Sequence, residues 1–399
     1  MESSPHDRNV FILGAGFSAQ AGAPLLDDFL DKSREFKDDP SFGLEADERQ
    51  RFEDVFKFRR EMAQSRDKVR IDLDNIEELF GLVELSRRLG RNNEKTRDAT
   101  VYLIAKTLEL AVKAPGNGRR EVVFNVKPEH NEEFRVANQH GRFKVGNAVF
   151  GADIYEYFAA LACGLLDVPP RRATRATAFI TFNYDLVLDR ALQRLQIQPD
   201  YQLTASSPQT SGLPQSGPTC PVLKLHGSAN WGVCGKCGKR VLVLPDKFTD
   251  SPRDFRFQEC DRCHKQSFQP LLIPPSWDKS DYHLMMRPVW TKAFAELKVA
   301  TRICIIGYSM PQSDMFFKYL LTLALSQNHG LSRLIVIDHN ANTHTSSLRE
   351  RYDQLLDPVF HKRRFTFNDD GFEMFFGSGD RALRALGRGE MLGGNISYR

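Results

Sequence analysis

The sequence lacks the long hydrophobic runs and the strong excess of one charge that mark several classes of protein. No uninterrupted apolar run reaches the roughly 20 residues that a membrane-spanning helix needs. The formal net charge is only +4 over 399 residues, which predicts neither a dedicated nucleic-acid surface nor a membrane surface. Residues 1–9 are polar and carry both signs of charge, so we expect no secretory signal peptide there.

Cysteine is scarce and unevenly distributed. Four of the seven cysteines form two Cys-x-x-Cys pairs, Cys234 with Cys237 and Cys260 with Cys263, separated by 22 residues. Without a secretion signal, such pairs indicate metal ligation in a reducing cytoplasm rather than disulfides. The spacing predicts a Cys₄ zinc ribbon, which is structural because four protein ligands leave no open position. Free cysteines that pair by chance are the alternative.

Short apolar runs alternate with helical patterns along much of the chain. Helices are expected near residues 186–195 and 315–326, between runs that have the length and composition of buried strands. This alternation argues for a parallel sheet covered by helices on both faces. The five predicted strands are residues 10–13, 178–182, 222–225, 302–306 and 334–337.

Other segments interrupt this alternation. Residues 19–36 have a helical pattern after an early break at Pro24. Residues 40–120 are charged, with apolar positions at helical spacing, and predict two to four helices in an insertion or cap. Residues 122–126 fit a strand, but the role of residues 121–150 stays open. The tail after Gly377 is rich in Gly and Arg, which indicates a mobile segment or a contact with a neighbouring molecule.

A glycine turn follows the first predicted strand. Glycine permits the sharp bend and lets backbone N–H groups approach a pyrophosphate, toward which the next helix would direct its positive end. The ordinary dinucleotide fingerprint has its third glycine three residues after the second, whereas Gly22 comes six residues after Gly16. A turn that binds nothing is the alternative. The residues that we expect to contact a dinucleotide here are Gly14, Ala15, Gly16, Phe17, Ser18, Gly22 and Pro24.

Three more motifs follow predicted strands, where open α/β sheets build their sites. They are Thr181–Phe182–Asn183–Tyr184–Asp185, Leu223–Lys224–Leu225–His226–Gly227–Ser228 and Ile306–Gly307–Tyr308–Ser309–Met310–Pro311. Together with the glycine turn, and in this order, they resemble the motifs of the sirtuin family. The Thr-x-Asn-Tyr-Asp and Gly-Tyr-Ser-x-Pro forms are more similar to those of bacterial sirtuin-like proteins. Sirtuins also carry a zinc ribbon after the His-Gly motif.

The resemblance implies a fold and a domain plan. The fold class is α/β, a sirtuin-type Rossmann fold with a parallel sheet, a helical insertion and a small zinc-ribbon module. We expect a single sirtuin-like domain over residues 1–399. Within it lie a mainly helical insertion or cap at 40–170, the zinc-ribbon module at 230–268 and a C-terminal tail at 378–399.

The resemblance also assigns roles in the chemistry of NAD. Nicotinamide leaves as a neutral base through an oxocarbenium-like transition state, as in glycoside hydrolysis. Asn183 would orient a water molecule or a ribose hydroxyl without adding a charge, and His226 would take the proton of the nucleophile. Asp185 would accept from the carboxamide of nicotinamide. The alternatives are a helix cap for Asn183 and a structural strand-end histidine for His226.

Two segments after the cysteine pairs, residues 307–314 and Asp338, complete the expected NAD site. Gly307, Tyr308 and Ser309 correspond to the sirtuin turn that contacts the adenosine half, and Asp314 fits the longer bacterial form. Asp338 ends the fifth strand and would bind the ribose hydroxyls, although sirtuin enzymes usually have Asn there and helix capping is the alternative.

The segment Asp74–Asn75–Ile76–Glu77 resembles a recurring piece of the bacterial branch, without an evident mechanism.

Two departures separate this sequence from the protein deacylases of the family. Where deacylases pair with a substrate peptide, residues 269–277 contain three prolines, which removes backbone donors. No arginine follows Pro24 at the place where deacylases have Asp-Phe-Arg. These departures are shared by bacterial sirtuin-like proteins that act as NAD hydrolases in antiviral defence.

The sequence therefore predicts an NAD hydrolase with structural Zn²⁺, catalysed by Asn183 and His226. An NAD-dependent protein deacylase and a non-catalytic module that binds NAD or ADP-ribose are the alternatives. Because free NAD hydrolysis is toxic, we expect gating by homo-oligomerisation or by a separate partner. The resemblance suggests a HerA-type DNA translocase or an Argonaute-like protein as that partner.

Overall fold

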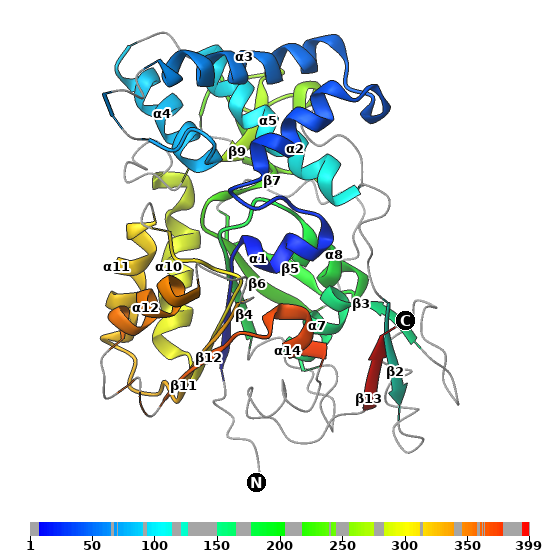
Figure 1. The fold of residues 1–399 in the computed structure, drawn as a ribbon, viewed down its shortest axis with the longest axis vertical. Helices are drawn as coiled ribbons and strands as arrows, with labels where there is room; N and C mark the ends of the chain where they lie inside the picture. Colours follow the sequence, from blue (N-terminus) through cyan, green and yellow to red (C-terminus); the bar gives the residue numbers. More distant parts are fainter. Residues whose placement is uncertain are drawn as a thin grey trace.

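The computed structural model describes most of the chain (Figure 1). The described residues are 8–64, 68–69, 71–90, 94–113, 121–126, 150–164, 177–203, 218–238, 241–244, 255–274, 283–311, 314–338, 345–356, 360, 362, 364–377 and 393–398. Most of residues 202–219, most of 121–150 and most of the tail lie outside them. Among the described residues, no helix is long and apolar enough to cross a membrane.

A seven-stranded sheet forms the centre of the molecule, and all of its strand pairs are parallel. The five predicted strands are confirmed. Two short edge strands were not predicted, because β5 is only partly buried and β12 is half-exposed along most of its length. The order is β12 (Phe365–Asn368), β11 (Arg333–Ile337), β10 (Arg302–Ile306), β1 (Asn9–Leu13), β4 (Thr177–Thr181), β6 (Thr219–Lys224), β5 (Gln198–Asp200).

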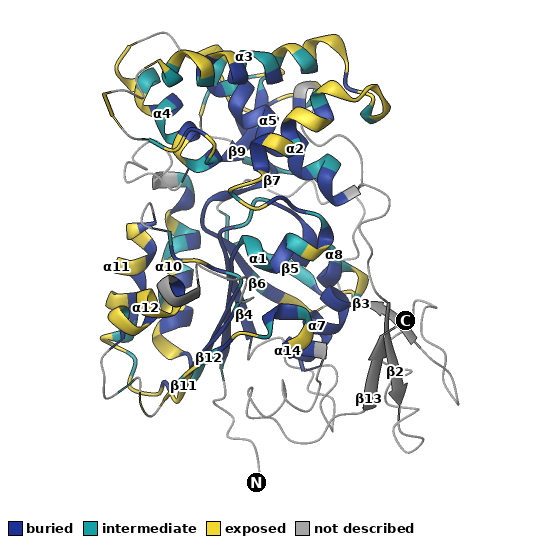
Figure 2. Ribbon diagram, viewed as in Figure 1, coloured by how far each residue is buried: buried dark blue, intermediate teal, exposed yellow. Residues whose placement is uncertain are grey.

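Helices cover both faces of this sheet, as the sequence predicts. Alternate residues of the five central strands enter two separate cores: Phe11 packs into one and Ile12 into the other. Figure 1 shows one group of helices on each side, and Figure 2 shows that the strands between them are buried. On one side lie α10 (His283–Val299), α11 (Met315–Leu325) and α12 (Thr345–Leu355); on the other lie α7 (Ile154–Ala162), α8 (Val187–Arg194) and α14 (Gly371–Gly377).

A helical cap stands over one end of the sheet (Figure 1). The described part of residues 40–120 contains three α-helices, which agrees with the predicted two to four, and α2 joins them. The first core continues without a break from the sheet into these helices, so the cap is packed as part of the same body. Its helices are α2 (Phe29–Asp38), α3 (Ala46–Ala63), α4 (Ile76–Arg88) and α5 (Glu94–Lys113).

Several segments differ from the sequence-based expectation. The helical pattern of 19–36 divides into a 3₁₀ turn (Ala19–Ala21) and α2, because Gly22 adopts a left-handed conformation. The short helix α1 (Ala15–Ser18) precedes this turn. Helix α7 was placed in the insertion, yet its Phe158 packs on Phe11 of the central sheet. The predicted strand at 122–126 is confirmed as β2 (Glu121–Val126).

The end of the tail also takes a defined place. Strand β13 (Gly393–Tyr398) pairs with β2, which in turn pairs with β3 (Phe150–Asp153). A contact with the chain's own β2 was not among the two alternatives that the composition suggested. Both pairings join segments far apart in the sequence, so composition alone did not reveal them.

The cysteine module contains a small antiparallel sheet. Strand β7 (Gly227–Cys234) lies between β8 (Val241–Val243) and β9 (Phe268–Leu272). Pro270 is tolerated in β9 because this strand is at the edge of the sheet. Strand β7 begins directly after His226, so the module and the His-Gly motif form one continuous element.

Candidate functional site

The carboxyl ends of five parallel strands meet at a cavity of about 300 Å³ below the cap. Ligands bind at this place in open α/β sheets. The structure brings together residues from all four sequence motifs and from the end of β11. The predicted site residues that line the cavity are Gly14, Ala15, Gly16, Pro24, Asn183, Asp185, His226, Gly307, Tyr308, Ser309 and Asp338.

Three predicted residues do not line it. Phe17 is 1% exposed and packs among aromatic rings of the core. Ser18 is buried behind Asn183, and Gly22 closes the 3₁₀ turn in a left-handed conformation. These residues support the glycine loop, and a ligand in this cavity would not touch them directly.

The glycines serve mainly to join two loops. A Cβ on Gly14 would lie 2.4 Å from the Gly307 carbonyl oxygen, and one on Gly307 would lie 2.3 Å from the Phe17 nitrogen. Gly14 N–H donates to Ile306 O and Gly16 N–H donates to Gly307 O. Contrary to our expectation, these two N–H groups are engaged within the protein. Helix α1 has four residues, so no long helix directs its positive end at the cavity from here.

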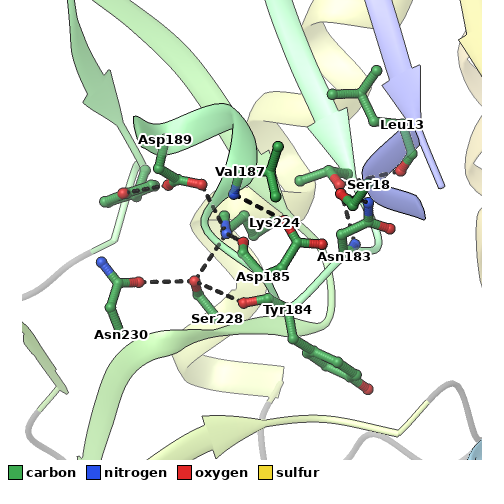
Figure 3. Close-up of polar contacts among 12 residues, drawn as sticks. Leu13, Ser18, Asn183, Tyr184, Asp185, Val187, Asp189, Lys224, Ser228 and Asn230 are labelled. Carbon is green, nitrogen blue, oxygen red and sulfur yellow. Dashed lines mark hydrogen bonds and ion pairs between the residues drawn. The ribbon is translucent and has the colours of Figure 1, made fainter. Parts of the chain in front are cut away.

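Asn183 connects the loop after β4 to the glycine loop (Figure 3). Its side-chain Nδ2 donates to Gly14 O at 2.8 Å and to Ser18 Oγ at 3.0 Å. The amide nitrogen is therefore committed to the protein, which assigns any contact with a ligand to Oδ1. Asn183 does not cap α8, whose N-cap residue is Leu186. Asp185 Oδ1 accepts from Val187 N–H, the first residue of that helix.

A buried polar network lies behind this loop (Figure 3). Lys224 forms an ion pair with Asp189 at 3.0 Å, and both side chains are 1% exposed. Its Nζ also donates to Asp185 O and to Ser228 Oγ. Burial raises the pKa of Asp185, whereas the charge of Lys224 opposes that shift. The network thus joins β6 and β7 to the loop that carries Asn183.

His226 is held at the junction of β6 and β7. Its carbonyl accepts from Ile273 N–H, and its ring lies 5.3 Å from that of Phe182. Gly227 has a φ of +88°, and a Cβ there would lie 2.0 Å from Leu271 O, so only glycine fits after this histidine. His226 Nε2 lies 3.6 Å from Asp314 Oδ1, a pairing that the sequence did not predict.

The cap supplies the opposite wall of the cavity. Asn75 caps α4 by accepting from Glu77 N–H and Glu78 N–H, which gives one residue of the recurring segment a structural role. Ile76 and Glu77 of the same segment line the cavity. Sequence reasoning missed the other lining residues of the helical cap because their spacing is that of an ordinary amphipathic helix. They are Phe29, Phe80, Ile104 and Leu108.

The far end of the cavity lies beside β11. Asp338 follows this strand, and its N–H donates to Asn368 O. Arg351 donates to Ser309 O at 2.9 Å, which holds the loop after β10 against α12. Residues 339–344 lie outside the described residues, so helix capping by Asp338 stays an alternative.

The four paired cysteines form one cluster, with every pair of sulfur atoms within 4.8 Å. Cys234 Sγ lies 3.6 Å from Cys263 Sγ, and Cys237 Sγ lies 3.8 Å from Cys260 Sγ. A tetrahedral Zn²⁺ with Zn–S bonds of about 2.3 Å requires sulfur separations of about 3.8 Å. The donor set and its geometry therefore fit zinc.

The electrostatics of the cluster also favour a cation. Burial opposes ionisation of Cys234, but hydrogen bonds from Ser267 and from backbone N–H groups lower the pKa of its thiol to about 6. Burial and the hydrogen bond with Cys234 raise the pKa of Cys263 to about 11. Thiolates this close repel one another, and a divalent cation among them removes that repulsion.

Zinc content tests this assignment. We expect one zinc ion per chain and its loss, with a lower Tm, in a Cys260→Ala variant. The module's own hydrophobic core is small, so it depends on the metal. Cys304→Ala is the matched control, because it removes a buried thiol outside the cluster. Atomic absorption and thermal melting measure both effects, and an unchanged zinc content in Cys260→Ala would refute the site.

Comparison with known proteins finds a family match for part of the chain. No curated protein matches it. A structure of Sir2Tm bound to a propionylated peptide has a TM-score of 0.36 and 13% identity, covering 95% of this chain and 93% of that chain. A structure of SIR2 with the inhibitor EX-527, 2'-O-acetyl-ADP-ribose and a deacetylated p53 peptide has a TM-score of 0.35 and 13% identity, covering 95% and 94%. Residues 177–357, which carry Asn183, His226 and the cysteine cluster, match the family model described as the SIR2-like domain.

Proposed function

We propose that this protein is an NAD hydrolase that releases nicotinamide and ADP-ribose. The observation that carries the proposal is the convergence of Asn183, Asp185 and His226 with the glycine loop in one cavity. The match of residues 177–357 to the SIR2-like domain supports NAD as the substrate. Asp338 lies at the end of the cavity where it would accept from ribose hydroxyls.

The reaction needs a positioned nucleophile and a proton acceptor. The bond between ribose C1′ and the pyridinium nitrogen breaks, and its electron pair stays with nicotinamide. A water oxygen bonds to C1′, and His226 takes the proton of that water. Asn183 Oδ1 accepts a hydrogen bond from the water or from a ribose hydroxyl and so orients it.

The cap favours a hydrolase over a protein deacylase. Helix α5 packs against β9, the strand that ends where deacylases pair with a substrate peptide. Ile104 and Leu108 of the same helix line the cavity. An extended peptide would have to displace this helix to reach the cavity, whereas a water molecule would not.

Turnover of NAD by the purified chain tests the proposal. We expect release of nicotinamide and ADP-ribose without any added peptide, measured by chromatography. His226→Ala should lower the rate by about 10²-fold or more, because it removes the proton acceptor. His329→Ala, a substitution of an exposed histidine after α11, should leave the rate unchanged.

Other outcomes would favour the alternatives. Turnover only with acyl-lysine peptides would favour a deacylase. Tight binding of NAD without release of nicotinamide would favour a non-catalytic binding module. The first result would refute the hydrolase, and the second would refute a hydrolase that acts without a partner.

We further propose that the activity depletes NAD in bacterial antiphage defence and is gated. The resemblance to bacterial sirtuin-like proteins supports this role, with a homo-oligomer or a partner such as a HerA-type DNA translocase or an Argonaute-like protein as the gate. A chain that stays monomeric in size-exclusion chromatography at every concentration would contradict gating by self-assembly.

A further inference from the structure

A carboxylate stands beside the proposed proton acceptor. Asp314 Oδ1 lies 3.6 Å from His226 Nε2, and the two side chains are 1% and 2% exposed. The other carboxylate oxygen, Oδ2, accepts from the Tyr308 hydroxyl at 2.8 Å. One acidic group thus contacts both His226, between β6 and β7, and Tyr308, in the loop after β10.

The Asp314 side chain does not cap its own helix, although it stands at the start of α11. Asp314 occupies the N-cap position of α11, where an aspartate usually accepts from the first N–H groups of the helix. Its side chain makes no such bond. It lies against Tyr308 and His226 instead, so a common local stabilisation is replaced by contacts across the cavity wall.

The surrounding groups hold this carboxylate in place. The Tyr308 ring stacks on Phe182 with centroids 4.3 Å apart, and Tyr352 donates to Tyr308 O at 2.7 Å. Burial, reinforced by the charge of Asp314, raises the pKa of Tyr308 well above its usual range. Tyr308 therefore stays a neutral donor, and Asp314 keeps its other oxygen on the side of His226.

We propose that Asp314 is a positioning residue for His226, holding the imidazole ring and stabilising the imidazolium that forms during hydrolysis. This inference rests on the proposed function. When His226 takes the proton of the attacking water at Nδ1, the positive charge appears beside the Asp314 carboxylate. The carboxylate, 3.6 Å from Nε2, stabilises this charge as its counter-ion and remains ionised, as in other catalytic carboxylate–histidine pairs. The proton then returns to solvent, and the enzyme is unchanged.

An Asp314→Asn variant tests the proposal by its pH profile. We expect kcat to fall by about 10²-fold with KM for NAD nearly unchanged, since Asp314 does not hold the dinucleotide. The acidic limb of kcat/KM should move to lower pH, because the imidazolium loses its counter-charge. The other carboxylates that line the cavity stay in place in this variant, and so the shift reports on Asp314; they are Asp27, Glu77, Asp185 and Asp338.

Two further variants separate this role from a structural one. Asp31→Asn changes an exposed aspartate of α2 and should leave kcat and the profile unchanged. Asp314→Glu retains the charge, so it should recover part of kcat and a profile close to that of the wild type. If Asp314→Asn does not fold, Asp314→Glu decides the question. Because this variant keeps the negative charge, an acidic limb of its kcat/KM profile that moves to clearly lower pH would refute the proposal.

An NMR titration of the His226 imidazole measures the same interaction without turnover. His226→Ala identifies the signal among the ten histidines. We expect its midpoint to fall in Asp314→Asn, and an unchanged midpoint would overturn the inference. A wild-type chain that consumes no NAD but shows the shift would refute the proposed function alone.

Discussion

Substitution of Asn183 by alanine should lower NAD turnover by about 10²-fold or more, while the protein stays folded. The side chain joins two loops, because Nδ2 donates to Gly14 O and Ser18 Oγ. It also presents Oδ1 as the acceptor for a water or a ribose hydroxyl. Alanine removes both functions, so the glycine loop is released and the nucleophile is no longer oriented.

A matched control exists at Asn328, which lies near the amino ends of β10 and β11 and does not line the cavity at their carboxyl ends. Its Nδ2 likewise donates two hydrogen bonds, to Leu297 O and Ala300 O, each at 2.8 Å. Both alanine variants should lose about 1–3 kcal/mol of unfolding free energy from the two bonds. Only Asn183→Ala should lose activity. Equal turnover in the two variants, measured as nicotinamide release, would contradict a catalytic role for Asn183.

Ser18→Ala separates the two functions of Asn183. It removes one of the two acceptors of Nδ2 and leaves Oδ1 in place, so we expect a smaller loss of turnover than in Asn183→Ala. A loss as large as that of Asn183→Ala would mean that the connection between the loops, and not the amide oxygen, accounts for the effect.

The sequence predicted the elements whose signal is local. The central strands are continuous apolar runs, and each enters both cores, so composition alone located them within a few residues. The two Cys-x-x-Cys pairs predicted the cysteine cluster because their spacing is also a local signal. Edge strands β5 and β12 were missed because their side chains are only partly buried.

The site was predicted less completely, because its remaining contacts are not local. Asp314 and His226 are 88 residues apart in the chain and meet only through the fold. Ile104 and Leu108 look like the apolar face of any helix, and nothing in their spacing distinguishes a cavity wall from a core. Gly14 and Gly16 were assigned to phosphate binding, whereas the structure shows their N–H groups bonded to β10 and its loop.

Substitution of Lys224 by methionine should cause a large loss of stability. Its ammonium group pairs with Asp189 where neither side chain is more than 1% exposed. Removing one partner of a buried ion pair leaves the other charge uncompensated, which costs about 3–5 kcal/mol. That is a large share of the 5–15 kcal/mol by which folded proteins are usually stable. Urea unfolding measures it, with Lys298→Met on the exposed surface of α10 as the matched control.

A double variant shows whether the network has a second function. Lys224→Met with Asp189→Asn removes both charges of the pair, so most of the unfolding free energy that was lost through an unpaired Asp189 should return. Turnover should stay low, because the bond from Lys224 Nζ to Asp185 O is absent and the loop that carries Asn183 is no longer fixed. If turnover returns together with stability, the ion pair supports the fold alone. If the double variant is as unstable as Lys224→Met, uncompensated charge is not the cause of the loss.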